Sequence, residues 1–187
     1  ICKSSYRVIA LTDEERQQIN NVQPKSKVFV MPNGLDPKPF NSVLSGDSRS
    51  PFNNEYILFL GRLDKVKGLD YLIESFGNVA DKVNFDLVIA GPDQANYQSL
   101  VNESEKLNVL EKNGRIKFLC SVDSTKKLSL IYNAKAFFLP SAGEGFSMAI
   151  LESLFLGCPV FATRECNITE IFKKKAAVEI YRDISKI

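Results

Sequence analysis

The chain has 187 residues, of which 44% are hydrophobic and 25% are charged. This length is enough for one complete α/β domain and part of another, and the hydrophobic fraction excludes an intrinsically disordered chain. The 24 basic and 22 acidic residues give a net charge of +2, and because these charges are spread along the chain, no broad basic surface for nucleic acid is predicted.

Short apolar runs alternate with helical patterns along the chain, which predicts βαβ units and a parallel sheet. The predicted strands are, in chain order, 7–11, 27–31, 56–60, 86–90, 115–119, 136–140 and 159–163. The predicted helices are 13–19, 68–79, 96–110, 124–133, 147–156 and 167–174. Thr12 and Asp123 precede two of these helices as N-cap signals. The sequence therefore predicts an α/β fold.

One polar stretch, rich in Ser, Asn, Gly and Pro, interrupts this alternation after residue 41. Such a composition is typical of a linker, which we place at 42–55. Residues 1–41 hold a strand, a helix and a strand, too little to close a sheet, so we expect them to be the remnant of an N-terminal domain with its interdomain connection. We expect 56–187 to be the main domain, truncated at its C-terminal end.

The cysteine pattern and the absence of histidine restrict the cellular compartment and the chemistry that the protein can carry out. Cys2, Cys120, Cys158 and Cys166 form no C-x-x-C pair, which favours a reducing, cytosolic compartment, and we expect Cys120 and Cys158 to be buried. No apolar run approaches the roughly 20 residues of a membrane span. Because the chain has no histidine, its chemistry must depend on carboxylates, Lys, Arg and backbone groups.

The first candidate site follows the strand 56–60, in the stretch GRLDKVKG. Ligands of parallel α/β sheets bind beyond the carboxyl ends of strands, so Arg62 and Lys67 are predicted to face the binding side. Gly61 permits close backbone approach, and the following helix start favours an anion, which points to phosphate. The alternative, that these cations are solvated charges of a connection, remains open. Neither GxGxxG nor GxxxxGK[ST] occurs, which disfavours common nucleotide-binding loops.

The second candidate site is the loop and helix start in SAGEGFSMAILE. Gly143 and Gly145 make the loop pliable, and Ser147 is predicted to cap the helix. The backbone amides of Phe146, Ser147 and Met148 would then form a second anion-binding helix terminus, since the first amides of a helix have no partner within it.

The same segment carries two glutamates. Glu152 is predicted to lie about one turn inside an apolar helix, where a carboxylate is costly unless it is hydrogen-bonded, and a ribose diol would supply two hydroxyl donors. The alternative places Glu152 on a solvated stripe of the helix. Glu144, in the loop, would reach a sugar hydroxyl or face water.

Two further segments carry weaker signals. Backbone groups of Ser121 and Val122, after the strand 115–119, are placed to contact a nucleotide base, although their composition is that of any βα loop. The three lysines at 173–175 suggest membrane headgroups, but lysines at a helix end also complement the helix dipole.

The order PNGLD, GRLDKVKG, LVIAG and LSLIYNAKAFFLPSAGEGFSMAILESLFLGCPV resembles the C-terminal half of a family-four retaining glycosyltransferase of the GT-B fold. The resemblance covers about 28–163, and seven residues separate the paired glutamates Glu144 and Glu152. It implies a Rossmann-like parallel sheet with helices on both faces. It also implies transfer of a hexose from a nucleotide sugar, such as a UDP or GDP sugar, to a hydroxyl with retention of configuration.

Carried over residue by residue, the resemblance assigns roles. Arg62 and Lys67 would bind the donor diphosphate, Glu152 the ribose, and Glu144 the donor sugar. The implied catalytic residues are Arg62, Lys67 and Glu144, and the implied donor-binding set is Gly61, Arg62, Lys67, Ser121, Val122, Glu144, Gly145, Phe146, Ser147, Met148 and Glu152. Such enzymes use no essential metal and no cofactor beyond the nucleotide-sugar substrate.

The sequence departs from the family pattern in three ways. Ser147 stands where glycine is common, and a stretch after Thr163 replaces a glycine-rich segment. The acceptor, a glycan, glycolipid or small molecule, would be bound by an N-terminal domain that is absent, so we expect this chain to bind donor but hardly to turn over. Peripheral contact of the full-length protein with the inner membrane face is a further expectation.

Two alternatives of different classes remain. One is a binding module that holds a nucleotide sugar without catalysis. The other is a sugar phosphorylase of the same fold. Such enzymes typically carry a pyridoxal-binding lysine in their C-terminal half, and no segment here shows a recognisable one.

Overall fold

The computed structural model describes residues 7–46, 48–93 and 104–183, in which the strands form two parallel sheets. The small sheet pairs β1 (Val8–Ala10) with β2 (Val28–Val30), and α1 (Asp13–Val22) connects them. The large sheet contains β3 (Tyr56–Leu60), β4 (Asp86–Ala90), β5 (Ile116–Leu119), β6 (Ala136–Leu139), β7 (Val160–Ala162) and β8 (Val178–Glu179). Its strand order is β5-β4-β3-β6-β7-β8, so the order reverses between β3 and β6.

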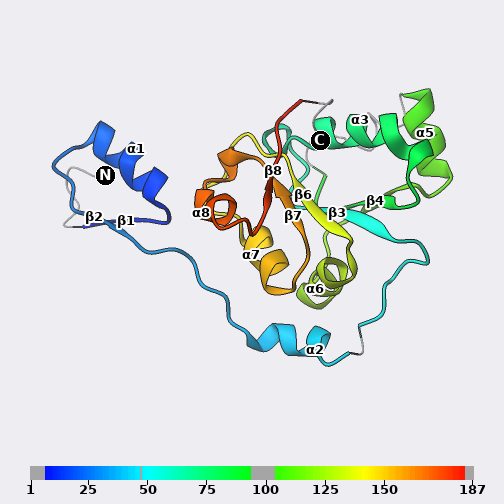
Figure 1. The fold of residues 1–187 in the computed structure, drawn as a ribbon, viewed down its shortest axis with the longest axis horizontal. Coiled ribbons are helices and arrows are strands. Elements are labelled where there is room, and N and C mark those ends of the chain that lie inside the picture. Colours follow the sequence, from blue (N-terminus) through cyan, green and yellow to red (C-terminus); the bar gives the residue numbers. More distant parts are fainter. Residues whose placement is uncertain (1–6, 47, 94–103, 184–187) are drawn as a thin grey trace.

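Helices cover both faces of the large sheet, with α3 and α5 on one side and α6 and α7 on the other (Figure 1). The helices of this part are α2 (Asn41–Leu44), α3 (Leu69–Val79), α5 (Glu105–Lys112), α6 (Ser124–Asn133), α7 (Met148–Phe155) and α8 (Thr169–Lys173). Short 3₁₀ turns lie at η1 (Lys38–Phe40), η2 (Lys65–Lys67), η3 (Ala80–Lys82) and η4 (Arg164–Cys166). The predicted Rossmann-like architecture is confirmed.

All seven predicted strands are present, with ends shifted by no more than one residue. The central strands β3 and β4 are almost entirely buried and, apart from Asp86 at the start of β4, carry the apolar sequences expected of a parallel sheet covered on both faces. The predicted helix 96–110 lies partly outside the described residues, and α5 extends two residues beyond its predicted end. Of the described α-helices and strands, α2, which has only four residues, and β8, which has only two, were not predicted.

The predicted linker starts inside α2. Phe40, just before α2, and Val43, inside it, are both buried, and α2 packs against α6. The proposed division into 1–41, 42–55 and 56–187 stays a prediction, although the first residues of the 42–55 segment are helical.

The amino-terminal edge of the large sheet is held by a buried carboxylate. The Asp86 side chain is 1% exposed and pairs with Lys117 and, at 3.0 Å, with the Nε of Arg115. Arg115 also donates hydrogen bonds to the carbonyls of Ala80, Val83 and Phe85. Because these charges are paired and hydrogen-bonded at the edge opposite the candidate site, we interpret them as structural.

The small sheet and α1 lie beside α8 (Figure 1), where Thr169 Oγ1 donates a hydrogen bond to Glu14. Ile9 and Phe29 pair across the two strands, and both side chains are more than half exposed. In the described part of the chain, no helix is both long enough and apolar enough to cross a bilayer.

Candidate functional site

The candidate site lies where the strand order reverses, at the carboxyl ends of β3 and β6. The loop after β3 and the loop after β6 are hydrogen-bonded to each other there. The Val66 carbonyl accepts a hydrogen bond from the amide of Ala142 at 2.6 Å and from Ser141 Oγ at 3.1 Å. A topological switch point of this kind is the usual ligand site of an open parallel sheet.

Glycines allow the backbones of these loops to touch. Gly68 has φ +66°, and a Cβ atom there would lie 2.0 Å from the carbonyl oxygen of Pro140. Gly91, after β4, has φ +143°, and a Cβ there would lie 1.8 Å from the carbonyl oxygen of Gly61. Only glycine fits these two positions, so they fix the path of the loop that carries Arg62 and Lys67.

The cations of the first loop have different surroundings. Asp64 caps η2 by accepting hydrogen bonds from the amides of Val66 and Lys67, at 3.0 and 3.2 Å. It also pairs with Arg62 at 3.3 Å, but the Arg62 side chain is 63% exposed. Arg62 therefore keeps solvent access and can turn toward an anion at a small cost, since exposed ion pairs contribute little.

Lys67 and Glu144 form an ion pair across the two loops. Their Nζ and Oε1 atoms are 2.5 Å apart, and the side chains are only 17% and 11% exposed. The structure thus brings together two residues that are 77 positions apart in sequence and that were predicted to bind neighbouring parts of one ligand. An ammonium group has three N–H donors, so Lys67 can hold Glu144 and a phosphate oxygen at once.

A third loop, after β7, holds the backbone of Glu144. The amide of Glu144 donates to the carbonyl of Glu165 at 3.0 Å, and its carbonyl accepts from Asn167 Nδ2 at 2.6 Å. Asn167 has φ +55°, a conformation that asparagine tolerates better than most residues. The segment after Thr163 therefore supports the site loop through an asparagine, although it lacks the family's glycine-rich stretch.

Ser147 caps α7 as predicted, because its Oγ accepts the amide of Ile150 at 3.4 Å. The helix begins at Met148, so the amides of Phe146, Ser147 and Met148 surround its amino end next to Glu144. The Ser147 side chain satisfies the helix terminus in the position where the family commonly has glycine.

Glu152 is buried, with the residue 8% exposed, so the alternative of a solvated stripe is wrong. Its Oε1 atom pairs with Nζ of Lys127, from α6, at 2.5 Å. Both residues line a pocket of about 230 Å³, together with Gly34, Leu35, Asp36, Pro39, Phe40, Ser124, Leu128 and Met148. Sequence reasoning missed Lys127, and the signal available was the need of a buried carboxylate for a cation.

Comparison with known proteins identifies the family. Residues 41–181 match the family described as glycosyl transferases group 1. The chain belongs to this family. It is 30% identical over 180 residues to an uncharacterized glycosyltransferase of Methanocaldococcus jannaschii, covering 90% of this chain and 45% of that protein. It is 29% identical to a probable sucrose-phosphate synthase of Thermosipho melanesiensis, covering 90% of this chain and 41% of that protein.

Solved structures support the same glycosyltransferase fold. WaaG, a glycosyltransferase of lipopolysaccharide biosynthesis, gives a TM-score of 0.76 at 19% identity over 94% of this chain and 49% of its own. Sucrose-phosphate synthase from Thermosynechococcus elongatus gives 0.78 at 19% identity, over 98% of this chain and 47% of its own. The predicted GT-B half is thus confirmed, and the chain spans less than half the length of these relatives.

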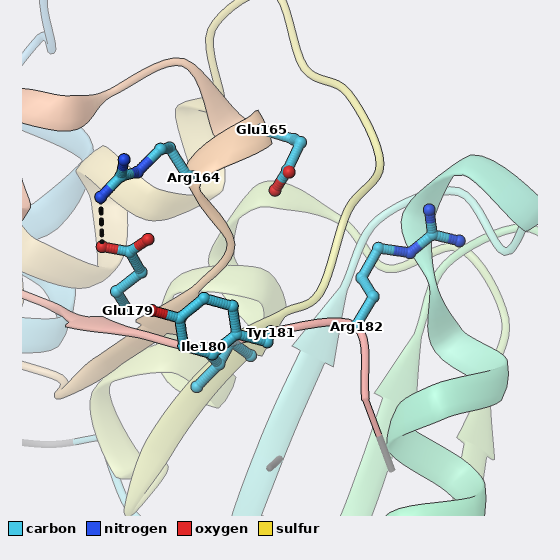
Figure 2. A pocket seen from close by; sticks show the side chains of 6 residues that line it. All are labelled: Arg164, Glu165, Glu179, Ile180, Tyr181 and Arg182. Carbon is cyan, nitrogen blue, oxygen red and sulfur yellow. Dashed lines mark hydrogen bonds and ion pairs between the residues drawn. The ribbon is translucent and has the colours of Figure 1, made fainter.

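A second hollow lies past the ends of β7 and β8 (Figure 2) and has a volume of about 260 Å³. Arg164 points to Glu179, 3.0 Å away, and this hydrogen bond raises the pKa of Arg164. Figure 2 shows Arg182 pointing away from that pair, and its guanidinium lies over the ring of Tyr71. Both arginines have partners within the chain, so we do not assign a ligand here.

The remaining predicted site residues lie at the same edge of the sheet. In the loop between β5 and α6, Ser121 is exposed and Val122 is half-buried. Asp123 caps α6 by accepting a hydrogen bond from the amide of Lys126 at 2.8 Å. Because β5 is two strands away from β3, these residues border the site instead of forming its centre. Their contact with a base stays a prediction.

The prediction that Cys120 is buried is wrong, because this residue follows β5 directly and is exposed in the loop. Cys158 is buried as predicted, and Cys166 is buried beside Thr163. Burial raises the pKa of the Cys158 and Cys166 thiols to about 11, above their ordinary value of 9.0.

These two thiols make folding stability depend on alkaline pH. In the unfolded chain they ionise first, so their contribution is fully present below about pH 9 and is lost as the pH rises toward 11. We expect the midpoint of urea unfolding, measured by circular dichroism, to be lower at pH 10.5 than at pH 8.5. These two pH values bracket the ordinary thiol pKa. The double variant Cys158→Ala, Cys166→Ala should show a shallower fall, and an equal fall would contradict the assignment.

Proposed function

We propose that the full-length protein is a nucleotide-sugar-dependent glycosyltransferase that transfers a hexose to a hydroxyl acceptor with retention, and that this chain is its donor-binding half. Membership of the glycosyl transferases group 1 family supports the transferase class. The likeness to a probable sucrose-phosphate synthase is consistent with a nucleotide-sugar donor. Because the chain covers less than half of such relatives, we assign the acceptor, a glycan, glycolipid or small molecule, to an N-terminal domain.

The observation that carries this proposal is the Lys67–Glu144 ion pair at the amino end of α7. At the switch point of the sheet, this pair brings together a cation, a hydrogen-bond acceptor for sugar hydroxyls, and the amino end of a helix. A diphosphate bound there would contact Lys67 and the amides of residues 146–148, and exposed Arg62 would close over it.

The proposed chemistry follows from charge. Transfer breaks the bond between the anomeric carbon of the sugar and a diphosphate oxygen, and negative charge develops on the departing diphosphate. Arg62, Lys67 and the α7 amides would stabilise that charge, while Glu144 would orient the sugar by accepting a hydroxyl hydrogen bond. We propose that these groups suffice without a metal ion or other cofactor, and that Gly61 and Gly145 let the ligand approach the backbone.

Two other functions use the same pocket. A binding module would hold the nucleotide sugar without turnover, and a sugar phosphorylase would replace the nucleotide by inorganic phosphate. An assay of the full-length protein with labelled donors separates the three, because only a transferase releases nucleoside diphosphate in proportion to glycoside formed. We propose that this chain alone binds the donor with little turnover. We also propose that the full-length protein is cytoplasmic and can contact the inner face of the membrane.

Donor binding is tested by thermal unfolding of the chain with UDP, GDP and ADP, each against its nucleoside monophosphate. One diphosphate at 100 times its dissociation constant should stabilise the fold by about 2.7 kcal/mol, seen as a higher melting temperature. The matching monophosphate should shift it less, because it lacks the phosphate that Lys67 would hold. Equal melting temperatures with all three diphosphates and without ligand would contradict the proposal.

A further inference from the structure

The Lys127–Glu152 pair is the feature of the site that the proposed roles leave unexplained. A ribose supplies hydrogen-bond donors to Glu152 but no positive charge, so the proposed roles do not include a protein cation beside this carboxylate. Here Nζ of Lys127 lies 2.5 Å from Oε1 of Glu152, and the two side chains are 28% and 11% exposed. Both line the pocket that the segment 34–36 also lines.

The pair offers a ligand both kinds of hydrogen-bonding group. Each carboxylate oxygen accepts more than one hydrogen bond, so Glu152 keeps acceptor capacity besides its contact with Lys127. The ammonium has three N–H donors, of which the pair uses one. A vicinal diol matches this set, because each hydroxyl donates one hydrogen bond and also accepts.

The surroundings favour the pair over other groups of the pocket as the polar contact. The Asp36 side chain accepts a hydrogen bond from the amide of Lys38 at 3.0 Å, and the residue is exposed. Leu35, Phe40 and Leu128 supply apolar surface. A buried carboxylate is costly when it is alone, and Lys127 offsets that cost while holding the Glu152 side chain at a defined position.

We propose that Lys127 is a positioning and specificity-determining residue for the donor nucleoside: it holds the Glu152 carboxylate and donates a hydrogen bond to the ribose 2′-hydroxyl oxygen, so that the site selects ribose over 2′-deoxyribose. This inference rests on the proposed donor-binding function. It adds a cation to a subsite for which the sequence pattern gave only a glutamate.

The test compares dissociation constants by isothermal titration calorimetry. Whichever of UDP, GDP and ADP binds most tightly is paired with its 2′-deoxy counterpart, and inorganic pyrophosphate is a third ligand. For the wild-type chain we expect the ribonucleotide to bind about tenfold more tightly than the deoxynucleotide, the usual effect of one hydrogen bond to a charged group.

The variants separate positioning from a general structural role. Lys127→Met should reduce the ribose preference to less than about twofold and leave pyrophosphate affinity within about twofold, whereas Lys127→Arg should restore most of the preference. Lys126→Met, at an exposed neighbouring position of α6, is the matched control and should keep it. If Lys127→Met does not fold, Lys127→Gln replaces the charged ammonium and its three N–H donors by a neutral amide with two, and a smaller but clear loss of the ribose preference is expected.

The outcomes are distinct. An unchanged ribose preference in Lys127→Met or Lys127→Gln would overturn the role of Lys127 and leave the proposed function intact. A wild-type chain that binds no nucleoside diphosphate would overturn both. A preference lost in Lys127→Met and regained in Lys127→Arg would support the inference.

Discussion

Replacing Gly68 with alanine is expected to destabilise the chain by about 3 to 5 kcal/mol, the range of severe single substitutions. The residue has φ +66°, which costs an L-amino acid about 1 to 2 kcal/mol. The new Cβ atom would also lie 2.0 Å from the carbonyl oxygen of Pro140, and because that atom is backbone, one of the two loops must move. Urea unfolding followed by circular dichroism measures the loss.

Two other glycines separate the causes of this loss. Gly157 has φ +73° but no atom within 4 Å of an added Cβ, so Gly157→Ala should cost only about 1 to 2 kcal/mol. Gly34 has neither a positive φ nor a neighbour within 4 Å, and Gly34→Ala should lie within about 0.5 kcal/mol of the wild type. Equal losses for Gly68→Ala and Gly157→Ala would show that the close contact of the loops does not exist.

Replacing Lys67 with alanine is expected to weaken nucleoside diphosphate binding by about 1.5 to 3 kcal/mol, which corresponds to an increase of about 10- to 150-fold in the dissociation constant. The same range is expected for Arg62→Ala. The physical reason is the loss of a charge-assisted hydrogen bond to a phosphate oxygen in a partly desolvated site. Calorimetric titration of each variant with the tightest-binding diphosphate measures the effect.

The controls address the ion pair and the local charge. Lys65→Ala removes an exposed cation from η2 and should change affinity by less than about 0.5 kcal/mol. Glu144→Gln breaks the pair with Lys67 but leaves the ammonium, so diphosphate affinity should be kept or increase, since a competing anion is gone. Unchanged affinity in both Arg62→Ala and Lys67→Ala would refute the phosphate assignment.

Local sequence signals predicted most of the fold. Apolar runs marked β3 (YILFL) and, after Asp86, β4 (LVIA), because strands covered on both faces need no polar alternation. Capping residues marked the starts of α1, α6 and α7, because the side-chain oxygen accepts an amide that the helix leaves unpaired. The two-residue strand β8 carries too few residues for periodicity to detect.

Contacts between distant segments were less accessible. Glu152 was predicted to be buried and in need of a partner, but periodicity does not tell which side of α6 faces α7, so Lys127 was missed. The end of the strand before Cys120 was predicted correctly at residue 119, but the apolar run did not tell that the first residue of the following loop is exposed. The pairing of Lys67 with Glu144 required the strand order, which places two loops far apart in sequence at one edge.

A crystal structure of the chain with its tightest-binding nucleoside diphosphate would show whether the diphosphate binds between Lys67 and the amino end of α7. We expect diphosphate oxygens within hydrogen-bonding distance, about 2.7 to 3.2 Å, of Lys67 Nζ and of an amide at the start of α7, with the ribose beside Glu152. A diphosphate bound at another edge of the sheet, or held without Lys67 and α7, would contradict this expectation.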